Sequence, residues 1–178
     1  MKNILITGRP ATGKTTLVKR LWTRFQDHHP VGFYTEEIRE HDSRVGFRIV
    51  SFLGHRITLA HKDLNTPYRV SRYSVDLEAF ERFLIDLEPH LKRANFVIID
   101  EIGKMECFSK YFISLTRKLL DSEKIVVATV SLKGGGLIEE VKHRVDSQLF
   151  EINDKTRDLI FTEIARVLQE ILSTNMLN

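Results

Sequence analysis

Two kinds of hydrophobic pattern alternate along most of the chain. One is the short, uninterrupted apolar run, which is typical of a strand covered by helices on both faces of a parallel sheet. Such runs predict strands at 2–7, 95–99 and 124–129, with a last one at 148–152. The other is an apolar stripe at helical spacing. It predicts helices that begin near Gly13, Asp76, Ser109 and Thr156, and a short one over 137–144. Alternation of strands and helices favours an α/β fold with a mainly parallel sheet.

A different pattern fills residues 31–73. Several short strands follow one another there, separated by turn signals at 41–43 and at Gly54, with no helical stretch between them. Consecutive strands joined by short turns pair antiparallel. We therefore expect an antiparallel insertion at about 31–73, at one edge of the parallel sheet, within a single domain that spans 1–178.

The first predicted strand leads into a phosphate-binding loop. The segment from Gly8 to Thr15 matches G-x-x-x-x-G-K-[ST] at every fixed position and lies between a strand and a helix. In such a loop the backbone N–H groups point at phosphate oxygens, Lys14 lies between the β- and γ-phosphates, and the Thr15 hydroxyl is a ligand for Mg²⁺. The predicted nucleotide-binding segment is Gly8, Arg9, Pro10, Ala11, Thr12, Gly13, Lys14, Thr15 and Thr16. The expected ligand is a nucleoside triphosphate.

A second group of candidates follows the strand at 95–99. Asp100 and Glu101 come directly after this apolar run, as in a Walker B motif. We expect Asp100 to hold Mg²⁺ together with Thr15, and Glu101 to polarise a water for attack on the γ-phosphate. Thr129, at the end of another strand, can sense the γ-phosphate or be an ordinary strand-end residue.

A basic group from outside the loop accelerates such reactions by orders of magnitude. The arginines considered for this role are Arg39, Arg48 and Arg144. Arg39 and Arg48 can equally be solvated residues of the antiparallel strands, and the sequence does not rank the three.

The composition limits the classes of ligand and partner that we expect. Lys and Arg number 27 against 24 Asp and Glu, and there is no basic run with interleaved aromatic residues, so we expect no nucleic-acid site. The sequence shows no signal peptide and no apolar run of membrane-spanning length, and Cys107 is its single cysteine. These features predict a cytoplasmic protein that does not bind a membrane. The histidines lack partners at zinc-ligand spacing, which leaves Mg²⁺ as the expected metal.

Three segments resemble a known family. They are Gly8–Thr16 with the following Leu17-Val18, the run Gly-Phe-Tyr-Thr-Glu-Glu-Ile-Arg at 32–39 with Gly-Phe-Arg at 46–48, and Asp-Glu-Ile-Gly-Lys-Met-Glu at 100–106. Together they are similar to the thermophilic nucleoside-triphosphatases, and the resemblance covers residues 2 to about 172. It implies a RecA-like P-loop fold and slow, Mg²⁺-dependent hydrolysis of nucleoside triphosphates with broad base tolerance.

The resemblance also assigns a residue to the base. Members of the family usually carry Asn-Arg near the start of the last helix, where this chain has Thr156-Arg157. It implies that Arg157 stacks on or pairs with the base, while the hydrogen bonds of the Asn are lost.

Two other functions use the same residues. A kinase would transfer the phosphate to an alcohol or phosphate acceptor, with Glu101 taking the acceptor's proton. A nucleotide-dependent switch would use hydrolysis only to reset its conformation, with the 32–37 segment as a partner surface. The loop at 131–136 has one lysine and no arginine, unlike the arginine-rich lids of nucleotide kinases, and this favours the hydrolase.

Overall fold

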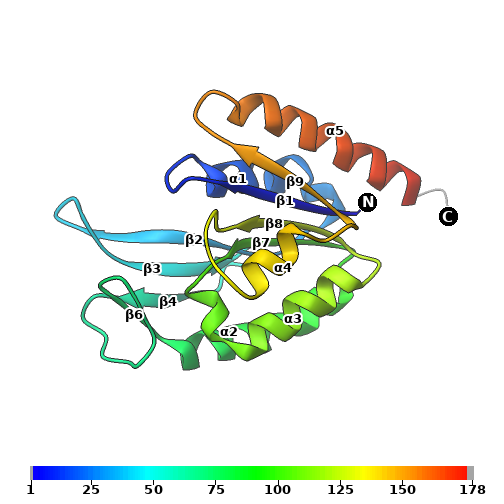
Figure 1. Cartoon of the computed structure of the whole chain (residues 1–178). Coiled ribbons are helices and arrows are strands. Elements are labelled where there is room, and N and C mark those ends of the chain that lie inside the picture. Colours follow the sequence, from blue (N-terminus) through cyan, green and yellow to red (C-terminus); the bar gives the residue numbers. More distant parts are fainter. Residues whose placement is uncertain (1, 176–178) are drawn as a thin grey trace.

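A mixed sheet carries the fold of the computed structural model, which describes residues 2–175. Met1 and residues 176–178 of the predicted domain lie outside the described residues. Within residues 2–175 nine strands form one sheet in the order β5-β6-β4-β3-β2-β7-β8-β1-β9 (Figure 1). Their bounds are β1 Asn3–Gly8, β2 Val31–Glu40, β3 Ser43–Ser51, β4 Arg56–His61, β5 Arg69–Val70, β6 Tyr73–Val75, β7 Phe96–Ile102, β8 Ile125–Val130 and β9 Ser147–Ile152.

The parallel half of the sheet places the functional strand ends together. β1 pairs with β8 on one side and with β9 on the other, and β7 pairs with β8 and β2, all in parallel. Strand β8 therefore separates the phosphate-loop strand from the strand that carries Asp100. Because the strands are parallel, their carboxyl ends meet at one edge, where open α/β sheets bind ligands.

The antiparallel half begins within β2. Residues Val31–Phe33 pair in parallel with β7, and from Phe33 onward the same strand pairs antiparallel with β3. β4, β6 and β5 extend this antiparallel part to the far edge. The α/β fold with an antiparallel insertion is thus confirmed, with two refinements: β2 belongs to both halves, and the insertion continues to Val75.

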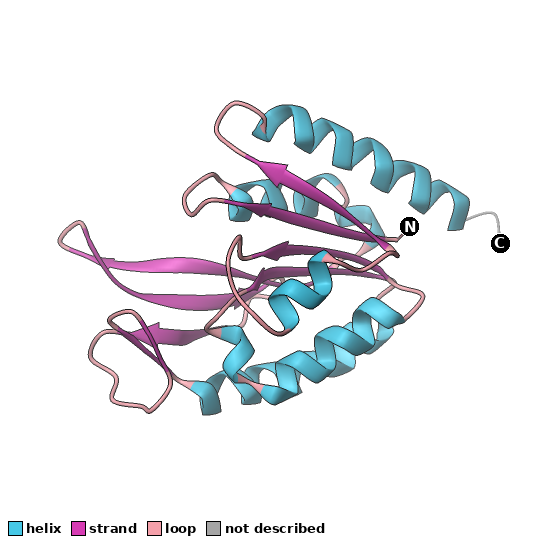
Figure 2. Ribbon diagram, viewed as in Figure 1, coloured by secondary structure: helices cyan, strands magenta, loops and turns pink. Residues whose placement is uncertain are grey.

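Helices cover both faces of the sheet (Figure 2). Their bounds are α1 Lys14–Arg24, α2 Leu77–Arg93, α3 Lys110–Asp121, α4 Leu137–Lys142 and α5 Arg157–Asn175, with 3₁₀ turns at Gln26–His28 and Glu106–Phe108. α1 and α5 pack on one face and α2, α3 and α4 on the other. Strand β7 contributes to both cores, with Phe96 and Ile98 facing α1 and with Val97 and Ile99 on the opposite side.

Two predicted helix starts are confirmed by their caps. The Asp76 carboxylate accepts a hydrogen bond from the Ala79 N–H at 3.0 Å, and the Ser109 hydroxyl accepts one from Phe112 N–H at 3.0 Å. Such caps satisfy N–H groups that have no partner within the helix. Among the described residues, no helix combines the length and the apolar character needed to cross a bilayer.

The end of one functional strand differs from the prediction. β7 does not stop at Ile99 but runs on to Ile102, so that Asp100 and Glu101 lie inside the strand. Its register with β8 shifts between Ile99 and Ile102. The two carboxylates are consequently fixed by the sheet rather than carried on a loop.

Candidate active site

The phosphate loop connects β1 to α1 and bends sharply at Gly13. Gly13 has φ 89°, a left-handed conformation that a residue with a Cβ rarely adopts. A Cβ at this position would also come within 2.8 Å of Cδ and Nη1 of Arg157. Arg157, which was predicted to contact the base of the nucleotide, therefore lies directly against the phosphate loop. Thr12 closes the turn, since its hydroxyl donates a 2.8 Å hydrogen bond to the carbonyl oxygen of Arg9.

Lys14 is the first residue of α1, and its ammonium group folds back over the loop. Its Nζ donates to the carbonyl oxygens of Gly8 at 3.1 Å and Arg9 at 3.3 Å. The same Nζ is 4.0 Å from Oε2 of Glu101. A cation held between the loop and a carboxylate of β7 stands where the terminal phosphates of a loop-bound triphosphate lie.

Asp100 is the most connected side chain of the site. Its Oδ2 accepts a 2.7 Å hydrogen bond from the Thr15 hydroxyl and a 3.2 Å bond from the Thr35 N–H. Its Oδ1 accepts a 2.6 Å bond from the Thr129 hydroxyl. Burial raises the pKa of this carboxyl above its usual value, and the bonds from Thr129 and Thr15 oppose that shift. The carboxylate is therefore held in one orientation by donors from two neighbouring strands, β2 and β8, and from helix α1.

The pair formed by Thr15 and Asp100 fits a magnesium ion. A hydroxyl and a carboxylate 2.7 Å apart are the hard oxygen donors that Mg²⁺ prefers. No group of three or more His, Cys, Asp or Glu side chains that could hold a metal occurs in the described part of the chain. Mg²⁺ in nucleotide sites needs no such cage, because one or two protein oxygens, phosphates and water complete its shell.

Glu101 is directed to the cavity on the side of Lys14. Its Oε1 accepts a hydrogen bond from the hydroxyl of Ser131, which follows β8, and its Oε2 faces the lysine. One oxygen of the carboxylate is thus used to orient it, while the other remains directed at the position of the terminal phosphate. This is the arrangement that a general base requires.

A second glutamate lies beside Glu101. The carboxylate oxygens Oε2 of Glu106 and Oε1 of Glu101 lie 2.8 and 3.0 Å from the point that a Cβ on Gly103 would occupy. Glu106 is only 5% exposed. Burial, with the charge of Glu101 as the next cause, raises the pKa of Glu106 to about 8. At neutral pH its carboxyl is therefore mainly protonated.

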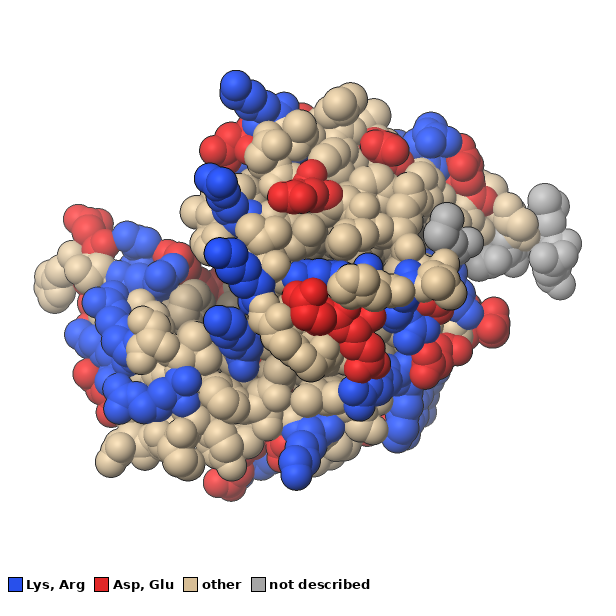
Figure 3. Space-filling model, viewed as in Figure 1, with Lys and Arg blue, Asp and Glu red and all other residues tan. Residues whose placement is uncertain are grey.

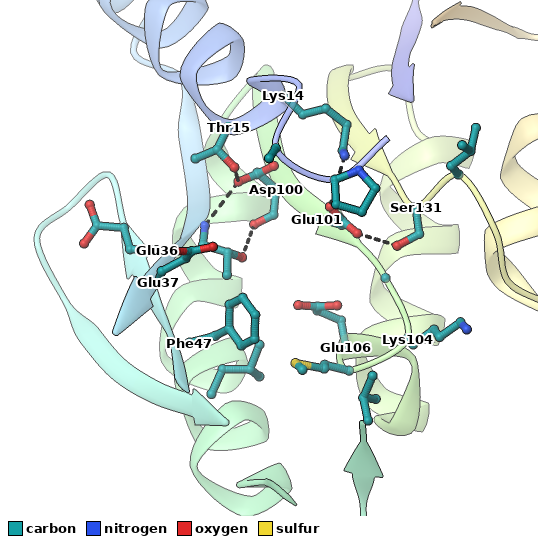
Figure 4. Close-up of a pocket in the computed structure, with 18 of the residues that line it drawn as sticks. Lys14, Thr15, Glu36, Glu37, Phe47, Asp100, Glu101, Lys104, Glu106 and Ser131 are labelled. Carbon is teal, nitrogen blue, oxygen red and sulfur yellow. Dashed lines mark hydrogen bonds and ion pairs between the residues drawn. The ribbon is translucent and has the colours of Figure 1, made fainter. Parts of the chain in front are cut away.

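These side chains line one cavity of about 570 Å³, a size typical of small-molecule sites. Figure 4 shows Lys14 and Thr15 on one side of Asp100 and Glu101, and Phe47 and Glu106 on the other. In the space-filling view the surface is hollowed between the antiparallel strands and the rest of the molecule, and Lys and Arg side chains stand along that border (Figure 3). The end of the cavity at the phosphate loop, where Lys14 lies, is suited to the phosphates of a ligand.

Comparison with known proteins identifies the family of the chain. A family model described as NTPase matches residues 3–165. The chain belongs to the NTPase family. A nucleoside-triphosphatase THEP1 from Thermotoga sp. (strain RQ2) is 45% identical over 167 residues, covering 93% of this chain and 95% of that protein. The human cancer-related nucleoside-triphosphatase is 34% identical over 187 residues, covering 94% and 97%. The chain is accordingly an enzyme, a nucleoside-triphosphatase.

Solved structures of the NTPase family share the fold. The crystal structure of THEP1 from Aquifex aeolicus has a TM-score of 0.82 and 36% sequence identity, covering 91% of this chain and 96% of that one. The solution structure of the human cancer-related nucleoside triphosphatase has a TM-score of 0.79 and 32% identity, covering 96% and 98%. The resemblance and the fold class stated from the sequence are both confirmed.

The structure does not bring the three candidate arginines to the cavity. Arg39 bonds to Glu37 and to the backbone at Asp42, at the turn of the β2–β3 hairpin, and Arg48 lies opposite Glu36 on β3 without lining the cavity. Arg144 donates to the carboxylates of Asp121 and Asp146, which raise the pKa of its guanidinium. Among the described residues, the cations that line the cavity are Lys14, Arg44 and Lys104.

Thr129 occupies a different position from the one considered. Its hydroxyl is fully buried and bonds to Asp100, and the residue does not line the cavity. It acts on the site through that carboxylate rather than by direct contact with a phosphate.

Sequence reasoning missed several residues of this site. Thr35 holds Asp100 through two bonds, since its hydroxyl also donates to the Asp100 carbonyl at 2.7 Å. Ser131 orients Glu101, and Glu106 and Arg44 line the cavity. Thr35 and Glu106 lie within two of the three segments that carry the family resemblance, so that signal could have found them. Ser131 and Arg44 have no local pattern that marks them.

Proposed function

We propose that this NTPase-family enzyme hydrolyses nucleoside 5'-triphosphates to the diphosphate and phosphate in a Mg²⁺-dependent reaction, slowly and with broad base tolerance. The observation that carries the proposal is the meeting of Thr15, Asp100, Glu101 and Lys14 at one end of the cavity. These are the groups that bind a metal–triphosphate complex and activate a nucleophile.

The chemical step follows from the positions of two side chains. Glu101 accepts a proton from a water whose oxygen attacks the γ-phosphorus, and the bond from that phosphorus to the β–γ bridging oxygen breaks. Lys14 and the N–H groups of the loop neutralise the charge that develops on the phosphate oxygens and on the departing diphosphate. Ser131 keeps the Glu101 carboxylate in the orientation that this transfer needs.

Thr15 and Asp100 would hold Mg²⁺, which when bound neutralises charge on the β- and γ-phosphate oxygens. Thr35 and Thr129 help Asp100 to act as a metal ligand, because their hydrogen bonds favour its ionised form. A buried carboxylate without such donors would be neutral and a poor ligand.

Slow turnover is supported by the cations of the cavity. An arginine that reaches the γ-phosphate is worth about 10³–10⁵ in rate in related reactions. Arg44, which does line the cavity, is engaged by Glu37 at 2.7 Å and by the hydroxyl of Tyr73 at 3.1 Å. With this arginine compensated, charge stabilisation falls mainly to Lys14.

Broad base tolerance is supported by the contact of Arg157 with the loop. A guanidinium plane stacks on any base without reading its hydrogen-bonding edge. The Thr156 hydroxyl is engaged within its own loop, since it accepts a 3.1 Å hydrogen bond from the Asn153 N–H. Base selection by this pair is therefore weak.

The test is phosphate release from ATP, GTP, CTP and UTP with Mg²⁺, in parallel with samples that contain EDTA. We expect release from all four, at rates within about tenfold of one another, and its loss with EDTA. Release from one base alone would contradict broad tolerance. Release that persists in EDTA would contradict the role of the metal.

A further inference from the structure

The cavity extends well past the residues that a triphosphate needs. Beyond Asp100 and Glu101 its walls come from the antiparallel strands and from the turn after β7. We call this part the side chamber; it is lined by Arg44, Phe47, Leu59, Val70, Met105 and Glu106. Figure 4 shows Phe47 and Glu106 facing each other across it, on the far side of Asp100 and Glu101 from Lys14.

Most of these walls contribute nothing to phosphate binding. Phe47, Leu59, Val70 and Met105 are apolar, and Phe47, Val70 and Met105 are only partly buried, so the walls suit a carbon framework. Charged phosphates gain nothing from such a surface, because a charge loses its hydration there. The proposed place of the base is at Arg157, against Gly13 of the phosphate loop, which leaves the side chamber for a second molecule.

The polar groups of the side chamber indicate a neutral occupant. The guanidinium of Arg44 lies 5.0 Å from the ring centre of Phe47 and is neutralised by Glu37. An anionic molecule would meet the carboxylates of Glu37 and Glu101, and a cationic one would meet Lys14 and Lys104. A hydroxyl group suits the buried carboxyl of Glu106, which can donate or accept a hydrogen bond.

We propose that the side chamber binds a small neutral alcohol with an apolar or aromatic body, and that this alcohol accepts the γ-phosphoryl group. Glu106 of the side chamber lies beside Glu101, and the other oxygen of Glu101, Oε2, is 4.0 Å from Lys14 Nζ, so an acceptor hydroxyl between the two glutamates lies near the terminal phosphate. Its oxygen attacks the γ-phosphorus, the bond to the β–γ bridging oxygen breaks, and Glu101 takes the hydroxyl proton. The products are a phosphate monoester and the nucleoside diphosphate.

This proposal goes beyond hydrolysis but uses the same proposed triphosphate site. Water and the alcohol compete for one phosphoryl group, so the ratio of phosphate ester to inorganic phosphate reports the side chamber directly. The enzyme is incubated with Mg²⁺, γ-labelled ATP and methanol, 1-propanol or benzyl alcohol at equal concentrations that leave its unfolding temperature unchanged.

We expect the ester-to-phosphate ratio to rise by about fourfold for each methylene that the chamber buries. It should be at least about tenfold higher for benzyl alcohol than for methanol. Val70→Trp fills the chamber from the partly exposed strand β5 and should reduce this preference to about twofold or less. Met105→Trp does the same from the turn after β7. Ile85→Trp adds the same ring to an exposed position of α2, away from the cavity, and should keep the preference.

The outcomes separate this proposal from that of hydrolysis. Equal ratios for methanol and benzyl alcohol, or a preference that survives both filling variants, would overturn the side chamber as an acceptor site. Inorganic phosphate without any ester would overturn it too, while supporting hydrolysis. Ester without inorganic phosphate would support the side chamber and contradict hydrolysis. If neither product forms, both proposals fail.

Discussion

The Thr129 hydroxyl donates a 2.6 Å hydrogen bond to Oδ1 of Asp100, so a residue that never reaches the cavity fixes the carboxylate at its centre. The two residues lie on adjacent parallel strands, and the bond is fully buried. The other carboxylate oxygen of Asp100, Oδ2, accepts hydrogen bonds from the Thr15 hydroxyl and the Thr35 N–H. The orientation of the carboxylate proposed to bind the metal is thus set by a residue outside the cavity.

Thr129→Val removes this bond and keeps the volume of the side chain. A buried hydrogen bond to a charged group is worth about 1.5–3 kcal/mol, and without it the pKa of Asp100 should rise further. We expect kcat/KM for Mg–ATP to fall by about 30-fold, measured by phosphate release. Thr129→Ser restores the hydroxyl and should recover most of the loss. Full activity of the valine variant would show that this bond is not needed.

Glu101→Gln removes the proposed proton acceptor without changing its shape. General base catalysis contributes about 10²–10⁴ in rate, so we expect kcat to fall by at least about 100-fold. Affinity for a non-hydrolysable triphosphate, measured by calorimetry, should stay within about threefold, since Lys14 and the loop are unchanged. The matched control is Glu36→Gln, the same change at a cavity residue that pairs with Lys19 at 3.2 Å. Equal losses in both variants would contradict a special role for Glu101.

Lys14→Ala tests binding rather than chemistry. The ammonium is 9% exposed and lies between the loop and Glu101, so its removal withdraws a charge from the terminal phosphates in a poorly hydrated site. We expect triphosphate affinity to fall by about 100-fold, and diphosphate affinity to fall less. Lys133→Ala removes an exposed lysine from the neighbouring 131–136 loop and should have little effect. Unchanged affinity of the Lys14 variant would mean that the loop is not the phosphate site.

The sequence predicted those parts of the site that rest on local pattern. The phosphate loop is a contiguous motif between a strand and a helix, and Asp100 and Glu101 follow directly on an apolar run. Helix caps such as Asp76 are equally local, because a cap bonds only three residues ahead. The fold class followed from the alternation of these elements.

Contacts between distant segments were not predictable in the same way. Thr35 bonds Asp100, 65 residues away, because the first part of β2 pairs with β7, and no local pattern states that pairing. Arg144 was a candidate for the site because its charge is visible in the sequence, while its partners Asp121 and Asp146 are visible only in the fold. The side chamber likewise depends on segments far apart in the sequence, the antiparallel strands β3, β4 and β5 and the turn after β7.

The protonation of Glu106 yields a prediction for stability. Its pKa in the folded protein is about 8 against an ordinary value of 4.5, because it is buried and faces the carboxyl groups of Glu101 and Asp100. The folded state therefore binds this proton more tightly than the unfolded state. The stability that it contributes is fully present below about pH 4.5 and is lost as the pH rises through about 8.

Glu106→Gln removes this titration and keeps the size of the side chain. We compare the unfolding free energy of the variant with that of the wild type. The difference should shift in favour of the variant by about 2–4 kcal/mol as the pH rises from 5 to 9. The measurement is urea unfolding at several pH values without nucleotide or metal. Asp100 also has a raised pKa, but it is present in both proteins, so most of its contribution cancels in the difference. The exposed Glu163→Gln on α5 should show no such trend. A difference that stays constant with pH would show that Glu106 ionises as an ordinary carboxyl group.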